Sequence, residues 1–174
     1  LSPSSAASDV YKRQAHNLQR IELSSDTITL GTIRRAMAEA REYGREDLLD
    51  PLRHVEAEAV RIFNSLRDEE DTTYDPLDLL PEDYDEFIEE TEALGEYVRK
   101  KRLDEGKRPR SSIYHLATFF KSALDHRGVK GVAFIAEREG ENLKLNIWDM
   151  RSSEILSERW RLFKRCIFLS GTLE

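Results

Sequence analysis

The residues with the clearest chemical potential lie near the end of the 174-residue chain. Ser170, Gly171 and Thr172 follow a short apolar run, residues 166–169. Continuously apolar runs are typical of strands buried on both faces, and ligands of open parallel sheets bind beyond the carboxyl ends of the strands. Two hydroxyls on either side of a glycine could there bond phosphates, waters or acidic side chains, because glycine lets the backbone approach a ligand closely.

A single histidine, His16, is the candidate near the start of the chain. Isolated histidines are more often structural or exposed than functional. His54, His115 and His126 lack ligand spacing such as H-E-x-x-H. The one cysteine, Cys166, lies in the apolar run and is expected to be a buried thiol. The sequence therefore predicts no metal site.

A run of basic residues is the third candidate. Sequence-independent binding of a single strand needs basic side chains on phosphates and aromatic rings under bases. The candidates are Arg99, Lys100, Lys101, Arg102, Lys107, Arg108 and Arg110, with Tyr114 just beyond them. The preceding residues 68–96 include many acidic side chains and no basic one. The basic run at 99–110 and the acidic run at 68–96 can both be solvated helix faces. Alternatively, the basic run forms a patch near a nucleic-acid path and the acidic run forms a face turned away from it.

Four amphipathic helices are expected before and around these charges, because apolar residues recur three and four positions apart. Thr32 is expected to cap the first helix, which ends at Gly44. The second begins at Asp50, or a turn earlier near Glu46. Residues 67–76 then form an acidic loop.

The third predicted helix opens at Pro81, buries a stripe that includes Tyr97, and ends at Gly106. The fourth is capped by Ser111 or Ser112. Short joints between amphipathic helices favour a small bundle.

The pattern then changes to that of strands. Residues 129–136 form a predicted strand, and after a turn apolar and polar residues alternate at 143–147, as in a second strand. Before the first helix, residues 21–30 are expected to form a short extended segment or loop. A short helix capped by Ser152 and a final strand at 165–169 follow. We expect a mostly helical α+β chain with a domain boundary near Ser111. The strands after it should belong to a sheet whose other strands lie outside the chain.

The composition favours a soluble, globular protein. Hydrophobic residues make up 39% of the chain and charged residues 35%, with a net charge of −7. No stretch approaches the roughly 20 apolar residues of a membrane span. The net charge argues against attraction of nucleic acid to the whole surface, but it allows a local basic groove. Residues 1–14 are rich in serine and alanine and are expected to be non-native read-through.

The order and spacing of these motifs resemble the XPD family of DNA helicases. Members have D-E-A-H-N at the second nucleotide motif, then the Arch insertion, then S-G-T-L; this chain has A-H-N at 15–17 and S-G-T-L at 170–173. Residues 35–44 and 94–98 look like Arch helices, and residues 147–152 look like the segment before the S-G-T strand. The resemblance covers residues 15–174.

The resemblance implies a domain organisation and a set of catalytic residues. Residues 15–28 would lead out of the first motor domain, residues 29–111 would form the helical Arch, and residues 112–174 would return into the RecA-like P-loop motor domain. The returning part would be a β-hairpin–helix–strand piece. The implied catalytic residues are His16, Ser170, Gly171 and Thr172, which would link the γ-phosphate site to the core and couple hydrolysis to strand movement.

The resemblance also implies an activity for the parent protein. That protein would be an ATP-dependent 5′-to-3′ helicase acting in DNA repair, with ATP, Mg²⁺ and a [4Fe-4S] cluster whose ligands lie outside this chain. Its partners would be single-stranded or forked DNA and the remaining helicase domains in cis, without a membrane, in the cytoplasm of an archaeal or bacterial type of cell. Arg13 and Gln14 stand where the family has its metal-binding acids, so this polypeptide alone is expected to be inactive.

Two other interpretations stay open. The chain could be a free-standing acidic helical module that binds a protein partner as a nucleic-acid mimic, using residues 68–96. It could also be a segment of a DinG-like helicase, which the upstream cysteine spacing would distinguish.

Overall fold

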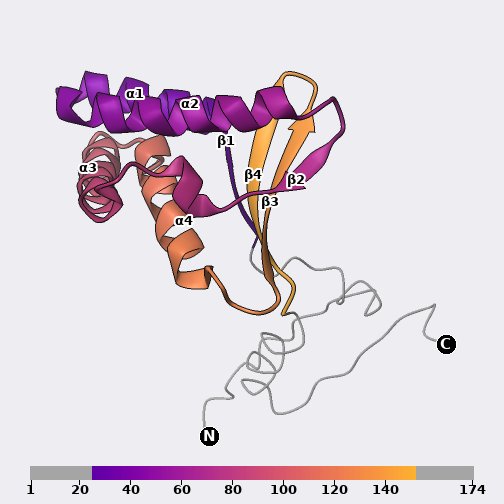
Figure 1. Cartoon of the computed structure of the whole chain (residues 1–174). Coiled ribbons are helices and arrows are strands. Elements are labelled where there is room, and N and C mark those ends of the chain that lie inside the picture. The colour runs from indigo at the N-terminus through magenta and orange to yellow at the C-terminus, as the bar shows by residue number, and fades with distance from the viewer. Residues whose placement is uncertain (1–24, 152–174) are drawn as a thin grey trace, which may run out of the picture. The chain divides into compact units, whose positions relative to one another are not determined.

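The computed structural model describes residues 25–151, of which residues 25–150 belong to one compact unit (Figure 1). The predicted catalytic residues His16, Ser170, Gly171 and Thr172 lie outside the described residues, as do the helix expected from Ser152 and the strand expected at 165–169. The elements are β1 (Ser25–Thr29), α1 (Leu30–Glu42), η2 (Glu46–Leu48), α2 (Leu49–Ser65), β2 (Asp71–Thr73), η3 (Pro76–Leu79), α3 (Tyr84–Asp104), α4 (Ser112–His126), β3 (Val132–Glu139) and β4 (Asn142–Asp149).

The four strands form one antiparallel sheet in the order β1-β4-β3-β2. The expectation that the hairpin belongs to a sheet completed outside the chain is therefore wrong. Its neighbours, β1 and β2, come from the segments before and after the first two helices. β2 also lies inside the predicted acidic loop at 67–76. Three residues are too few for a period-two pattern, so no strand was predicted there.

The expected alternation in β4 is confirmed. Leu143, Leu145 and Ile147 are buried in the core between the sheet and the helices. Leu145 is paired with Ile28 of β1 and with Ala136 of β3. Because side chains alternate across a strand, this register gives all three strands one apolar face.

Helix α4 lies at the centre of the fold, between α3 and the sheet (Figure 1). Its buried residues Ile113, Leu116, Phe119 and Phe120 point to more than one side, and α4 packs on both α1 and α3. A wide apolar face of this kind lets one helix pack against more than one neighbour. The domain boundary predicted near Ser111 is therefore not a division between compact units, because α4 joins the helices to the sheet.

Several helix ends differ from the predicted ones by one turn. Thr29, not Thr32, caps α1, and the two threonines form a reciprocal capping box in which each backbone N–H donates to the other side chain. Asp50 does not cap α2; it lies in the first turn and pairs with Arg53. Helix α2 begins at Leu49, one residue before the predicted start at Asp50, while the alternative start at Glu46 is the first residue of the separate turn η2.

Tyr97 does not belong to the buried stripe of α3, because its side chain is 56% exposed. The buried residues of α3 include Phe87, Thr91, Leu94 and Val98. With about 100° per residue, Tyr97 lies more than roughly 90° around the helix from the centre of that stripe. Among the helices within residues 25–151, none is both long and apolar enough to cross a lipid bilayer.

Candidate nucleic-acid interface

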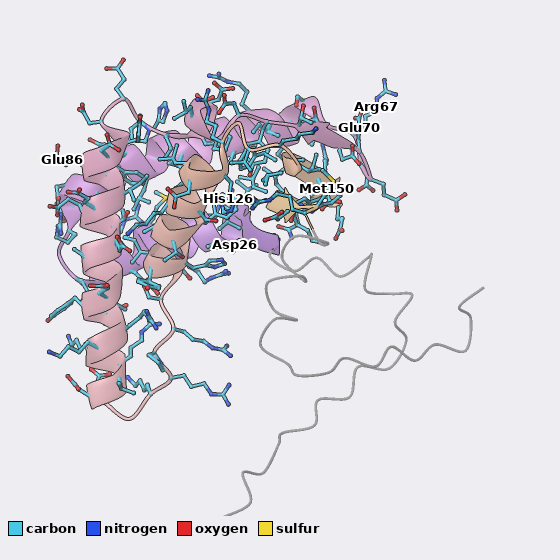
Figure 2. The ribbon with its side chains drawn as sticks, turned by 90° about the horizontal axis from the view of Figure 1, so that it is seen from below. Asp26, Arg67, Glu70, Glu86, His126 and Met150 are labelled. Atoms are coloured by element: carbon cyan, nitrogen blue, oxygen red, sulfur yellow. The ribbon has the colours of Figure 1, made fainter. Side chains whose placement is uncertain are left out.

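Charge changes sign along α3. Its first turn carries Asp85 and Glu86, and its last turn carries Lys101 and Arg102. This order complements the helix dipole, which favours anions at the N-terminus and cations at the C-terminus. Figure 2 shows Glu86 near one end of α3 and the loop that leads to α4 at the opposite end. The basic candidates therefore gather at one end of α3, the longest helix among residues 25–151.

Two arginines of α3 support the loop that follows it. The Nε of Arg99 donates to the carbonyl of Pro109 at 3.3 Å, and Arg102 donates to the carbonyl of Arg110. The guanidinium of Arg99 also lies 4.1 Å from the ring centroid of Tyr114. This is cation–π distance. Arg99 and Arg102 thus use their donors to hold backbone in place.

The buried carboxylate of Glu39 on α1 anchors the end of the same loop. It accepts hydrogen bonds from the Ser111 hydroxyl at 2.7 Å and from the backbone N–H groups of Ser112 and Ile113 at 3.1 Å. Arg102 pairs with it at 3.3 Å. These N–H groups begin α4 and have no intrahelical acceptor, so a buried anion there is stabilised by both hydrogen bonds and the helix dipole.

A cavity of about 460 Å³ lies at the basic end of the structure. It is lined by Glu42, Tyr43, Lys101, Arg102, Glu105, Lys107, Arg108 and Arg110. Five of the predicted basic residues therefore surround one cavity. The sequence predicted their charge and approximate location, but it did not indicate that α1 would supply the opposite wall.

An aromatic residue that the sequence did not single out forms part of that wall. The ring of Tyr43, at the end of α1, packs edge-on against Tyr97 with centroids 5.9 Å apart. The ammonium of Lys101 lies 4.9 Å from the centroid of the Tyr43 ring. A lone tyrosine before Gly44 has no distinguishing spacing, so only the packing of α1 beside α3 reveals this position.

The remaining lining charges differ in how fully they are paired. Lys107 bonds Glu105 at 2.8 Å, which raises the pKa of the Lys107 ammonium and lowers that of the Glu105 carboxyl. In the part of the chain that the structure describes, the exposed side chains of Arg108 and Arg110 have no hydrogen bond or ion pair. Lys100 is exposed too but does not line the cavity.

The acidic run at 68–96 is partly neutralised by cations from other elements. Arg45 bonds both Asp47 and Glu90, and these bonds raise the pKa of its guanidinium. Lys121 of α4 pairs with Glu92 at 2.8 Å. Ion pairs thus connect part of the acidic run to other elements, while many of its carboxylates at the start of α3 stay exposed.

Within residues 25–151, no group of histidine, cysteine, aspartate and glutamate side chains is arranged to hold a metal ion. The comparison with protein-family models and the comparison with curated proteins found no match for the chain.

Proposed function

We propose that the chain is a fragment of an ATP-dependent 5′-to-3′ DNA helicase of the XPD type, in which residues 25–149 form a domain inserted into the first motor domain. The observation that carries this proposal is the pairing of β1 with β4, which sets Ser25 opposite Trp148. The first and last strands of the compact unit are therefore neighbours.

An inserted domain needs this arrangement, because the host domain continues on both sides of it. Paired residues of antiparallel strands have Cα atoms about 5 Å apart. The chain can thus enter and leave residues 25–149 at almost the same point, and a host fold can be completed across the gap. The proposed insertion is longer than the helical segment 29–111 expected from the resemblance, since it includes α4 and the hairpin β3–β4.

In this proposal the flanking segments supply the chemistry. His16, Ser170 and Thr172 would belong to the motor domain and act on ATP together with residues outside this chain. Mg²⁺ and the [4Fe-4S] cluster would be held by residues outside this chain. The inserted domain would contribute surface for the DNA strand, with the RecA-like motor domain providing force.

The test is to extend the reading frame and assay the complete protein. The proposal expects Asp-Glu directly before Ala15, and a G-K-[ST] loop and four cysteines further upstream. The purified protein should unwind a fork with a 5′ single-stranded tail, using ATP, and should leave a fork with only a 3′ tail intact. An initiator codon near Ala15 with a stop codon after Glu174, or a complete protein without ATP-dependent unwinding, would overturn it.

An acidic protein-interaction module is the second candidate. The exposed carboxylates at the start of α3 favour it, among them Asp85, Glu86 and Glu89. A module of this kind would be encoded alone, would compete with nucleic acid for a basic protein, and would not bind DNA itself. The reading frame separates it from the helicase. The spacing of any upstream cysteines then separates an XPD-type from a DinG-like parent.

A further inference from the structure

We propose that the cavity between the C-terminal ends of α1 and α3 binds one nucleotide of a single strand, with its phosphate on Arg108 and Arg110 and its base against Tyr43. This inference deepens the proposed function and rests on it for the source of the strand. It replaces a broad basic patch with a defined subsite and assigns different roles to its arginines.

The balance of charge in the cavity favours an anion. Five cationic side chains line it against the two carboxylates of Glu42 and Glu105. Glu105 is already paired with Lys107. Arg108 and Arg110 are the lining guanidinium groups without a hydrogen bond or ion pair in the described part of the chain, and the Lys101 ammonium, also without either, lies over the Tyr43 ring. Guanidinium groups present a planar fork that matches phosphate oxygens, so these two residues are the phosphate ligands.

Arg99 and Arg102 hold the loop between α3 and α4 in position before any ligand binds. Arg102 connects Glu39 of α1 to the carbonyl of Arg110, and Arg99 holds the carbonyl of Pro109. Both arginines therefore act as positioning residues, although they belong to the same basic run. A loop held at both Pro109 and Arg110 loses little freedom on binding, which favours affinity.

Tyr43 supplies the surface for a base. Its ring packs against the hydrophobic core and is braced by the edge of Tyr97. The Lys101 ammonium near the ring lies on a flexible stem, so it can swing from the aromatic ring to a phosphate when a base arrives. Stacking on an aromatic ring tolerates every base, which suits a protein that moves along a strand.

The size of the cavity is consistent with this ligand. Its volume of about 460 Å³ lies within the range of about 300–1,000 Å³ typical of small-molecule sites. An acidic peptide is the competing occupant, because it would also meet the basic side chains. It has no planar ring for Tyr43 to stack upon, so the contribution of the base distinguishes the two.

The experiment measures binding of the complete 174-residue chain to fluorescent oligothymidine of roughly 20 nucleotides, longer than common single-strand sites, without ATP. Arg108→Ala/Arg110→Ala is compared with Arg61→Ala/Lys130→Ala, which removes the same charge from exposed positions outside the cavity and outside the basic run at 99–110. The first variant should bind at least about 10-fold more weakly and lower the salt slope by about 0.7, the value for one lost phosphate on a single strand. Equal losses in both variants would overturn the proposal.

The base contact is tested with an abasic strand of the same length. The unmodified chain should prefer oligothymidine over the abasic strand by about 5-fold or more. Tyr43→Ala should remove this preference, and Tyr43→Phe should keep it. Equal binding of both strands by the unmodified chain, or equally strong competition by polyglutamate, would overturn the proposal without any variant.

The outcomes separate this proposal from the helicase proposal. Binding of oligothymidine by this chain needs no motor domain, so the proposed subsite is tested by a binding measurement without ATP. Unwinding by the complete protein tests the parent activity independently, whether or not the cavity binds DNA.

Discussion

Gly95 of α3 lies so close to Tyr114 of α4 that a β-carbon on the glycine would stand 2.5 Å from the Tyr114 Cα. Real β-carbons do not approach other atoms so closely. The contact is with backbone and the first side-chain carbon, which cannot move aside on their own. The two helices therefore pack at a distance that only glycine permits, and this contact places the Tyr114 ring beside Arg99.

Gly95→Ala should destabilise the protein, although alanine is the better helix former by about 1 kcal/mol. The added methyl group must push α3 away from α4, which costs about 1–3 kcal/mol beyond that gain. The free energy of unfolding in urea measures the effect. Glu96→Ala, at the exposed neighbouring position, should change it by no more than about 0.5 kcal/mol. A more stable Gly95→Ala variant would show that the helices are further apart than described.

Glu39→Ala should lower the free energy of unfolding by about 3 kcal/mol, because three donors at the start of α4 lose their acceptor and Arg102 loses its partner. Glu39→Gln retains the shape of the side chain and one accepting oxygen, and only its NH2 group cannot accept, so its loss should be smaller. Hydrogen exchange should locate the effect in the first turn of α4. Unchanged exchange there in Glu39→Ala would contradict the capping role.

Asp75→Asn tests a pH-dependent contact between η3 and the end of α4. Arg127 bonds both oxygens of the Asp75 carboxylate, at 2.9 and 2.7 Å, and holds the pKa of Asp75 below its ordinary value of 3.8. Because the folded-state pKa is lowered, the contribution to stability is complete above pH 3.8 and is lost as pH falls through the lower folded-state pKa.

The Asp75→Asn variant should be less stable than the unmodified chain at neutral pH, by at most about 1 kcal/mol because the pair is partly exposed. Asparagine can still accept the Leu77 N–H bond, so the substitution isolates the charge. In urea titrations the difference should shrink as the pH falls through the lowered folded-state pKa of Asp75 and vanish below it. Asp104→Asn, at an exposed position, is the control. A difference that persists unchanged to low pH would contradict the ion-pair explanation.

The sequence predicted the fold where periodic patterns are long. The four helices, the hairpin alternation at Leu143 and Leu145, and the cap at Ser111 are confirmed because each depends on local signals. β1 and β2 were not recognised as sheet partners, since their pairing depends on strands more than 60 residues away in sequence. The boundary near Ser111 followed from a change of local pattern that tertiary packing overrides.

The basic cavity was predictable only in part. A run of like charges is visible in any sequence, so the cluster at 99–110 could be named in advance. Arg99 and Arg102 differ from the unpaired Arg108 and Arg110 because they bond Glu39 or the loop carbonyls of Pro109 and Arg110. No charge pattern in the sequence reveals these contacts. The role of Tyr43 depends on how α1 lies beside α3.

The isolated 174-residue polypeptide should not hydrolyse ATP, with or without single-stranded DNA. The positions that match the metal-binding acids of the family hold Arg13 and Gln14, and phosphoryl transfer needs a positioned metal and water. A phosphate-release assay measures this directly. Sustained, DNA-stimulated hydrolysis that copurifies with the chain would contradict it.

The pairing of Ser25 with Trp148 makes one measurement decisive for the proposed insertion. In the complete parent protein, residues 25–149 are replaced by a Gly-Ser linker of about four residues, enough to span the roughly 5 Å between paired strands. If these residues are an inserted domain, the shortened protein should still fold and hydrolyse ATP, while its DNA affinity falls. A shortened protein that is unfolded, when the unmodified parent is folded and active, would show that residues 25–149 belong to the motor domain itself.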